Sequence, residues 1–259
     1  MRSLRLPSAI LLACLFVAGG IGTINPSDLP EDGGRMSINF STWHLHDSLE
    51  VQTVWLPVLQ ALEERSGGRI SCNLFDVGAL GSGPDHYEIV ASGRSDMGYA
   101  TLTWTPGRFP LSDVLSLPAT IEGKETATEI GRAVYGRALR GEFAGVKVLE
   151  VNPCVNSHLW TNEPVETIED VAGLRIRTPG GLQTRCIEAL GAVPVFIPLD
   201  AVRVAMENGT IDGIVTCPSM IQPFGLDGVA PPLPLVTFGC VAEVLLMNQD
   251  AWLRTPGEP

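Results

Sequence analysis

Arg175 and Arg177 alternate with apolar residues in the segment 173–178. This period of two is typical of a β-strand and predicts that both guanidinium groups lie on one face of it. The residues Pro179-Gly180-Gly181 then end the strand. Ligand crevices of α/β sheets open at the carboxyl ends of strands, and a planar guanidinium can hold a carboxylate through two parallel hydrogen bonds. Arg177 is therefore the first candidate for an anion-binding residue, the alternative being a solvated surface arginine.

The elements after Arg177 alternate between helix and strand patterns. An apolar stripe at helical spacing over 182–190 is followed by a short apolar strand over 192–196. A second helix is predicted over 199–206, and another strand over 211–215. This half of the chain is therefore predicted to be an α/β unit.

Three motifs in this half carry a family resemblance. They are EDVAGLRIRTP at 169–179, ALGAVP at 189–194 and MENGTIDG at 206–213. In this order and spacing they resemble the solute-binding proteins of TRAP (tripartite ATP-independent periplasmic) transporters, a DctP-like, C4-dicarboxylate-binding family. The resemblance implies a periplasmic-binding-protein-like fold, with two α/β lobes that close over a ligand cleft. It also implies that Arg177 holds the carboxylate of an organic acid.

The first half of the chain is predicted to start with a parallel sheet. Strand patterns at 38–41, 70–75 and 96–100 are separated by helical patterns, an order that favours parallel pairing. The helix that starts near Ser48 contains Pro57, which predicts a kink or a late start. A further helix is expected over 124–139 and a strand over 146–151. The motifs SGGRI, ALG and GRSDM at 66–97 extend the resemblance, which covers 36–252.

The 259 residues carry a net charge of −12, and 45% of them are apolar. This length allows one large domain or two small ones, and the negative charge argues against nucleic acid as a partner. The resemblance implies that lobe I comprises 36–155 and 241–259 and that lobe II comprises 156–240. The long closing helices of the family are missing after Trp252, so a truncated chain with exposed apolar sheet surface is expected.

The amino terminus resembles an export signal. Arg2 and Arg5 precede the apolar run 9–18, which is short for a membrane span. We predict a signal peptide over 1–22, a flexible leader over 23–35 and a periplasmic location. A lipoprotein and an uncleaved anchor remain as alternatives.

The predicted ligand residues lie at strand ends in both lobes. Lobe II contributes Arg177, Phe196 and Thr216, and lobe I contributes Trp43, His44, Thr101, Thr103 and Trp104. Each has an alternative: the tryptophans could be core or rim residues, Phe196 is more typical of a core, and Cys217 could take the place of Thr216. His44 and His46 could suggest a metal, but without further ligands a hydrogen-bonding or exposed role is favoured, and neither a metal nor a cofactor is expected.

Five cysteines remain after the predicted signal peptide: Cys72, Cys154, Cys186, Cys217 and Cys240. Their odd number and wide spacing favour buried free thiols, although an oxidising compartment would permit one disulfide.

The ligand is predicted to be a small monocarboxylate with an apolar body, such as a branched 2-oxo acid, a lactate-like acid or an aromatic acid. Relatives that bind sialic acid carry a second basic residue near Ser157-His158, so sialic acid is disfavoured. The expected partners are the small and large membrane subunits of a TRAP permease.

The sequence also bears on functions other than transport. The motifs of hydrolases and of nucleotide-binding enzymes are missing from the sequence, so the protein is not expected to be an enzyme. An enzyme on the same fold would have Cys186 or Cys217 as its nucleophile. The remaining alternatives are a ligand-sensing module for a membrane receptor and a truncated, non-functional paralogue.

Overall fold

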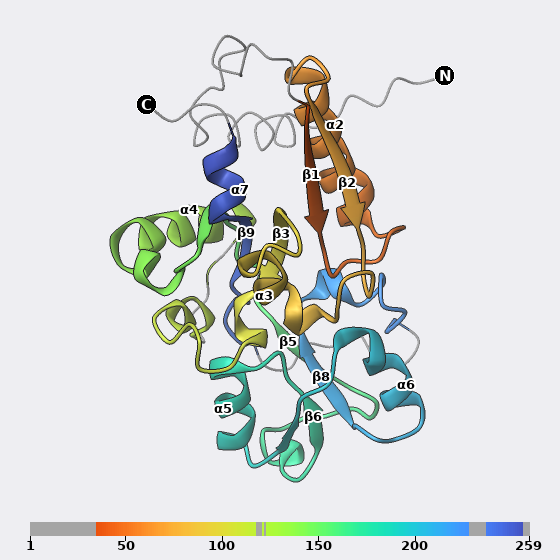
Figure 1. Cartoon of the computed structure of the whole chain (residues 1–259). Helices are drawn as coiled ribbons and strands as arrows, with labels where there is room; N and C mark the ends of the chain where they lie inside the picture. The colour runs from red at the N-terminus through yellow and green to blue at the C-terminus, as the bar shows by residue number, and fades with distance from the viewer. Residues whose placement is uncertain (1–34, 118–120, 122, 228–236, 256–259) are drawn as a thin grey trace.

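The computed structural model describes residues 35–117, 121, 123–227 and 237–255 (Figure 1). The predicted signal peptide and nearly all of the leader lie outside these residues. Figure 1 shows one β-sheet in the upper half of the molecule and a second sheet in the lower half. Within the described residues, no helix has the length and apolar character needed to cross a membrane.

The first sheet has the strand order β2-β1-β3-β9-β4. Its strands are β1 (Met36–Ser41), β2 (Ile70–Phe75), β3 (Met97–Thr101), β4 (Val146–Val151) and β9 (Glu243–Asn248). As predicted, β1 pairs in parallel with both β2 and β3. Strand β9 comes from the end of the chain and runs antiparallel to β3 and β4. The parallel prediction therefore holds for the first three strands but not for the sheet as a whole.

The second sheet has the strand order β5-β8-β6-β7. Its strands are β5 (His158–Thr161), β6 (Arg175–Arg177), β7 (Val193–Val195) and β8 (Gly213–Thr216). Strand β6 pairs in parallel with β7 and β8, whereas β5 is antiparallel to β8. Strands β6, β7 and β8 were predicted, with ends that differ by a few residues, whereas β5 was not predicted.

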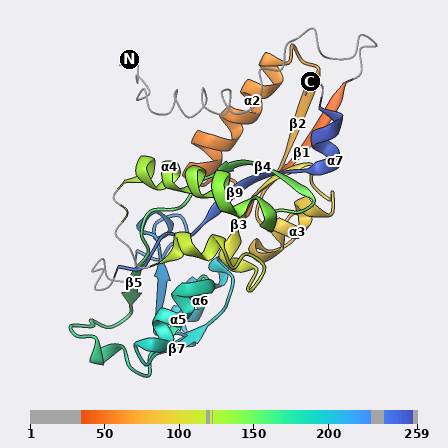
Figure 2. The same cartoon turned by 90° about the vertical axis from the view of Figure 1, so that its left-hand side faces the viewer.

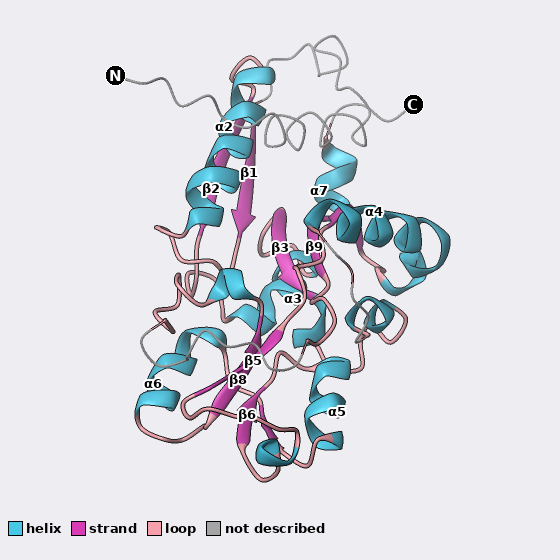
Figure 3. Cartoon of the chain, turned by 180° about the vertical axis from the view of Figure 1, so that it is seen from behind, coloured by secondary structure: helices cyan, strands magenta, loops and turns pink. Residues whose placement is uncertain are grey.

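Helices cover both sheets. They are α2 (Leu56–Arg65), α3 (His86–Ala91), α4 (Lys124–Val134), α5 (Gly181–Ala189), α6 (Val202–Glu207) and α7 (Gln249–Arg254). Pro57 is the second residue of α2, but helical residues precede it without a break: 49 and 50 are α-helical, and Val51–Trp55 form a π-helical segment. The predicted late start is therefore wrong, and the irregularity is instead the π-helical segment just before Pro57. Figure 2 shows α2 and α3 on opposite sides of the first sheet, and Figure 3 shows α5 and α6 flanking the second.

The alternation of side chains along β9 explains why its four central residues, 244–247, are all apolar. Leu245 and Met247 pack in the core that includes α2, whereas Val244 and Leu246 pack in the core that includes α3. Successive side chains of a strand point to opposite faces, so a strand in a covered sheet must be apolar on both. All six residues of β9 are buried.

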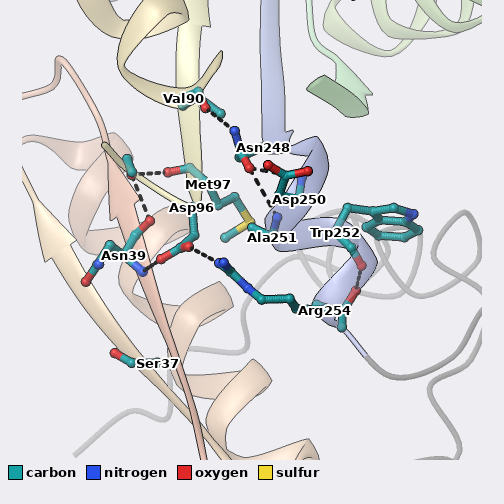
Figure 4. Close-up of polar contacts among 12 residues, drawn as sticks. Ser37, Asn39, Val90, Asp96, Met97, Asn248, Asp250, Ala251, Trp252 and Arg254 are labelled. Carbon is teal, nitrogen blue, oxygen red and sulfur yellow. Dashed lines mark hydrogen bonds and ion pairs between the residues drawn. The ribbon is translucent and has the colours of Figure 1, made fainter. Parts of the chain in front are cut away.

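Helix α7 is tied to the first sheet at both of its ends (Figure 4). At its start, the side-chain oxygen of Asn248 accepts the backbone N–H groups two and three residues later, and its amide nitrogen donates to the carbonyl oxygen of Val90. At its end, Arg254 forms a 3.0 Å ion pair with Asp96, whose other oxygen accepts the N–H of Asn39 in β1. These bonds connect the last helix to the first strand.

A disulfide joins the two segments by which the chain passes between the sheets. Cys154 follows β4, Cys217 follows β8, and their sulfur atoms are bonded. The prediction of free thiols is therefore wrong for this pair, because the fold brings together two cysteines that are 63 residues apart. Cys72, Cys186 and Cys240 are free.

Candidate functional site

Arg177 is the last residue of β6, and its side chain is almost entirely buried, with 2% exposed. Its Nε donates a hydrogen bond to the carbonyl oxygen of Ile197 at 3.0 Å. Among the described residues, this is its only hydrogen bond, and no carboxylate forms an ion pair with it. Burial lowers the pKa of Arg177 from the ordinary arginine value to about 10, while the negative charge of Asp200 acts in the opposite direction. The site thus contains a buried cation without an adjacent counter-ion.

Arg175 lies two residues earlier on the same strand and has a different environment. Its side chain is exposed and forms an ion pair with Asp212, with 2.6 Å between Nη2 and Oδ1. The period of two correctly predicts that both arginines share a face, but only Arg177 reaches the end of the strand that faces the other lobe. The position of Arg177 at the strand end explains why it is buried at the lobe boundary while Arg175 is exposed.

A pocket opens at Arg177, between the two sheets. Its volume is about 320 Å³, which includes its mouth to solvent. The first lobe lines it with Trp43, Val77, Gly83, Pro84 and Trp104, and the second lobe with Arg177, Phe196, Ile197, Pro198, Leu199, Asp200 and Phe224. Among the described residues of this lining, Arg177 is the one cation and Asp200 the one anion.

Aromatic rings form much of the pocket wall. The rings of Trp43 and Trp104 meet edge to face with their centroids 4.8 Å apart, and Phe224 stacks on Trp43 at 6.5 Å. Phe196, which is 47% exposed, lies at the rim. Such a wall suits a flat or apolar ligand body, while Arg177 supplies the charge for an acidic group.

Two side-chain polar atoms at the pocket are buried and without hydrogen-bond partners among the described residues. They are Nε1 of Trp43 and Nε1 of Trp104, two residues of the pocket lining. Buried donors are usually satisfied, so these groups retain hydrogen-bonding capacity beside the aromatic wall.

His44 lies behind the wall. Its ring stacks on that of Trp43 with centroids 4.0 Å apart, and its Nδ1 is hydrogen-bonded to Thr42 Oγ1 at 2.7 Å. Burial lowers the pKa of His44 to about 3, so the ring is neutral. His46 is exposed and lies 3.2 Å from Asp76. The described residues contain no cluster of three or more His, Cys, Asp or Glu side chains able to hold a metal.

The three predicted threonines are buried but are not part of the pocket lining. Thr103 contacts the other lobe at Gly181, and Thr216 ends β8, where its carbonyl oxygen accepts a hydrogen bond from Trp160. Of the eight predicted ligand residues, the structure brings Arg177, Trp43, Trp104 and Phe196 together around one pocket. Direct ligand contacts of His44, Thr101, Thr103 and Thr216 remain predictions.

The lobes touch at Gly180, which caps the start of α5, and at Gly181, the first residue of that helix. Gly180 has a φ of +99°, and a Cβ atom there would overlap the carbonyl oxygen of Thr103 in the first lobe. Nearby, Gln183 Nε2 donates to the carbonyl oxygen of Gly239 at 2.7 Å. The glycine pair therefore ends the Arg177 strand and also lets the lobes approach each other.

Asp200 and Phe224 line the pocket but were not among the predicted ligand residues. Asp200 lies only four residues after the predicted strand over 192–196, so its position near a strand end could have predicted it as a pocket residue. Phe224 lies in a turn after β8 and had no comparable signal.

Neither of the two cysteines considered as nucleophiles has an environment that favours a thiolate. Cys217 is in the disulfide, and Cys186 is half-buried with a pKa raised by burial, which reduces its thiolate fraction.

Comparisons with known proteins agree on one family. The model of DctP, "Bacterial extracellular solute-binding protein, family 7", matches residues 40–258. A solute-binding protein of Chromohalobacter salexigens is 25% identical over 193 residues, which are 73% of this chain and 57% of that protein. The chain thus spans less than two thirds of the length of the curated relatives it matches first.

Solved structures share the fold. A TRAP solute-binding protein from Rhodoferax ferrireducens, in complex with copurified benzoate, matches with a TM-score of 0.78 and 25% identity, covering 85% of this chain and 71% of that one. A marine metagenome TRAP solute-binding protein specific for aromatic acid ligands matches with a TM-score of 0.80 and 22% identity, covering 86% and 71%. The predicted α/β, periplasmic-binding-protein-like fold class is confirmed.

Proposed function

The chain belongs to family 7 of the bacterial extracellular solute-binding proteins, and from this premise we propose that it captures a small organic acid outside the cytoplasm and delivers it to a TRAP-type membrane permease. The observation that carries the proposal is Arg177, a buried guanidinium with a single hydrogen bond at an aromatic pocket between two lobes. A ligand carboxylate would compensate its charge through two hydrogen bonds.

We propose a monocarboxylate with an apolar or aromatic body, rather than a C4-dicarboxylate. One cation lines the pocket, which leaves a second carboxylate without a partner, and Trp43, Trp104, Phe196 and Phe224 offer apolar surface. The similar proteins that carry benzoate or 3-hydroxybenzoate support this choice. The family resemblance implies a second basic residue near Ser157-His158 in relatives that bind sialic acid, so we do not propose sialic acid.

Binding would proceed by lobe closure. Residues of both lobes line the pocket, so a ligand held by Arg177 gains contacts with Trp43 and Trp104 only when the lobes approach. A ligand that makes more contacts in the closed form shifts the population toward it. We propose that the closed form then docks on the small and large TRAP membrane subunits, that the chain is exported to the periplasm by residues 1–22, and that it is not an enzyme.

Two measurements test the proposal. Mass spectrometry of the natively purified protein should detect a small carboxylic acid, and thermal shift assays should find stabilisation by acids of the same class. Arg177→Ala should abolish both, whereas Arg175→Ala, a change of the exposed arginine on the same strand, should leave them intact. The proposal is wrong if no acid from a broad panel stabilises the wild-type protein.

Delivery to the permease needs its own test. Uptake of the identified acid should depend on this protein in cells that express the two TRAP membrane subunits. Equal uptake with wild-type protein and with Arg177→Ala would contradict a transport role.

A further inference from the structure

Asp200 is the second charged residue of the pocket lining and has no role in the proposed anion capture. It is exposed and lies in the short helical turn Leu199–Ala201, three residues after Ile197, whose carbonyl oxygen holds Arg177. In the part of the chain that the structure describes, its carboxylate forms neither a hydrogen bond nor an ion pair. Asp200 therefore presents an unpaired negative charge to the pocket.

The charges of Asp200 and Arg177 influence each other without touching. The negative charge of Asp200 opposes the effect of burial on Arg177, yet no ion pair joins the two side chains. A ligand carboxylate on Arg177 would therefore have Asp200 in its neighbourhood. Because a carboxylate accepts hydrogen bonds and donates none, the group that complements Asp200 is a donor or a cation.

Among the described lining residues, there is no second cation to balance a second negative charge. Apart from Arg177 and Asp200, the described lining residues are apolar or aromatic, and the nearby Arg203 is engaged by Glu207 at 2.9 Å. A dicarboxylate would place its second charge near Asp200 with no cation to balance it. Lobe closure removes water from the pocket and strengthens this repulsion.

Building on the proposed function, we propose that Asp200 sets the charge selectivity of the pocket. The site takes an acid with one carboxylate, bound by Arg177, and with a hydrogen-bond donor at its other end, bound by Asp200. An ammonium group satisfies Asp200 best, a hydroxyl group less well, and a second carboxylate is excluded.

Two series of acids with similar shapes test this selectivity by calorimetry on the full-length protein as purified. The aromatic series is 3-(aminomethyl)benzoate, 3-(hydroxymethyl)benzoate and isophthalate, with benzoate as reference. The aliphatic series is γ-aminobutyrate, γ-hydroxybutyrate and succinate, with butyrate as reference. In at least one series, affinity should fall in the order ammonium, hydroxyl, carboxylate, with steps of about five- to tenfold, since Asp200 is partly screened by water.

Asp200→Asn should remove most of these differences in affinity, chiefly by raising the affinity for the dicarboxylate relative to that for the reference acid. Glu188→Gln is the matched control, because it deletes one exposed negative charge of the same lobe outside the pocket. This control should keep the wild-type order. Raising the salt concentration should reduce the selectivity of the wild-type protein and have little effect on Asp200→Asn.

The outcomes separate the two proposals. If reference acids bind but Asp200→Asn leaves the ratio of dicarboxylate to reference affinity unchanged, the role of Asp200 is wrong and anion capture by Arg177 stands. The proposed selectivity is also refuted if the wild-type protein binds dicarboxylates with the same affinity as the reference acids. Failure of every carboxylic acid to bind refutes the proposed function, and the selectivity with it.

Discussion

Arg177 donates its Nε hydrogen to the carbonyl oxygen of Ile197 at 3.0 Å, so the side chain is held by the same segment, 196–200, that lines the pocket. This bond fixes the guanidinium plane and leaves its two terminal nitrogens for a ligand. A preorganised donor pair loses little entropy on binding, which favours affinity. The arrangement costs stability in the empty protein, because a buried charge lacks a counter-ion.

Arg177→Met should stabilise the unliganded protein by about 2 kcal/mol while abolishing acid binding. Lowering the pKa of Arg177 from the ordinary arginine value to about 10 corresponds to a destabilisation on the order of 3 kcal/mol, which the substitution removes. Loss of the hydrogen bond to Ile197 offsets about 1 kcal/mol of this gain. Urea unfolding measures the difference. Arg175→Met should instead be neutral or slightly destabilising, since it removes an exposed ion pair. A marked loss of stability in Arg177→Met would show that the charge is compensated.

Glu243→Gln should stabilise the protein above pH 7 and have little effect near pH 4.5. Burial raises the pKa of Glu243 from 4.5 to about 7, partly opposed by Lys124 and by the 2.9 Å hydrogen bond from Tyr99. A group whose pKa is raised in the folded state contributes stability below its unfolded pKa and loses it as pH rises through the folded value. The difference in unfolding free energy between variant and wild type should grow by on the order of 3 kcal/mol from pH 4.5 to pH 8.

The buried histidines His44 and His86 make the protein less stable as pH falls, which is opposite to the effect of Glu243. Their contribution is the same in wild type and in Glu243→Gln, so it cancels in the difference between the two. Burial lowers the pKa of His44 to about 3 and of His86 to about 4, so both proteins lose stability as pH falls below 6.5. Tyr99→Phe provides a second check, because it removes the hydrogen bond that lowers the pKa of Glu243 and should move the loss of stability to higher pH. If the unfolding free energies of wild type and Glu243→Gln change with pH in the same way, the raised pKa of Glu243 is contradicted.

Gly180→Ala should weaken acid binding by more than tenfold. The added Cβ would overlap the carbonyl oxygen of Thr103 and hold the lobes apart. Gly173→Ala is the matched control, because it has a similar φ of +81° in the same lobe but open space around it. Backbone strain should cost about 1–3 kcal/mol in Gly180→Ala, because its φ of +99° and ψ of −170° are essentially restricted to glycine, and about 1–2 kcal/mol in Gly173→Ala. Only Gly180→Ala should also lose affinity and give a larger radius of gyration by X-ray scattering with ligand; equal affinities would mean that this contact is irrelevant to closure.

Reduction of the Cys154–Cys217 disulfide should lower the free energy of unfolding by about 4 kcal/mol. The cross-link closes a loop with a sequence separation of 63 residues, which limits the freedom of the unfolded chain. Urea unfolding with and without a phosphine reductant measures the effect, and the double variant Cys154→Ser/Cys217→Ser should reproduce it. In Cys186→Ala, which removes a free thiol, the reductant should act as it does on the wild type. A reductant effect that persists in the double variant would exclude this disulfide as its cause.

Sequence reasoning performed best where hydrophobic periodicity is strong. The predicted strand over 70–75 coincides with β2, and the strand over 146–151 coincides with β4. The antiparallel entry of β9 between β3 and β4 could not be predicted in the same way. Pairing partners depend on contacts between residues far apart in the chain, and the apolar run at 244–247 is compatible with either direction.

The amino-acid sequence by itself determined the α/β character, the position of Arg177 at a strand end and the match of the three motifs to one family, because these depend on local periodicity and on residue spacing. Only the tertiary structure decided that Arg177 is buried while Arg175 is exposed, that Asp200 shares the pocket, and that Cys154 bonds to Cys217. Burial, the proximity of charges and disulfide pairing arise when distant segments pack together, so no local pattern encodes them.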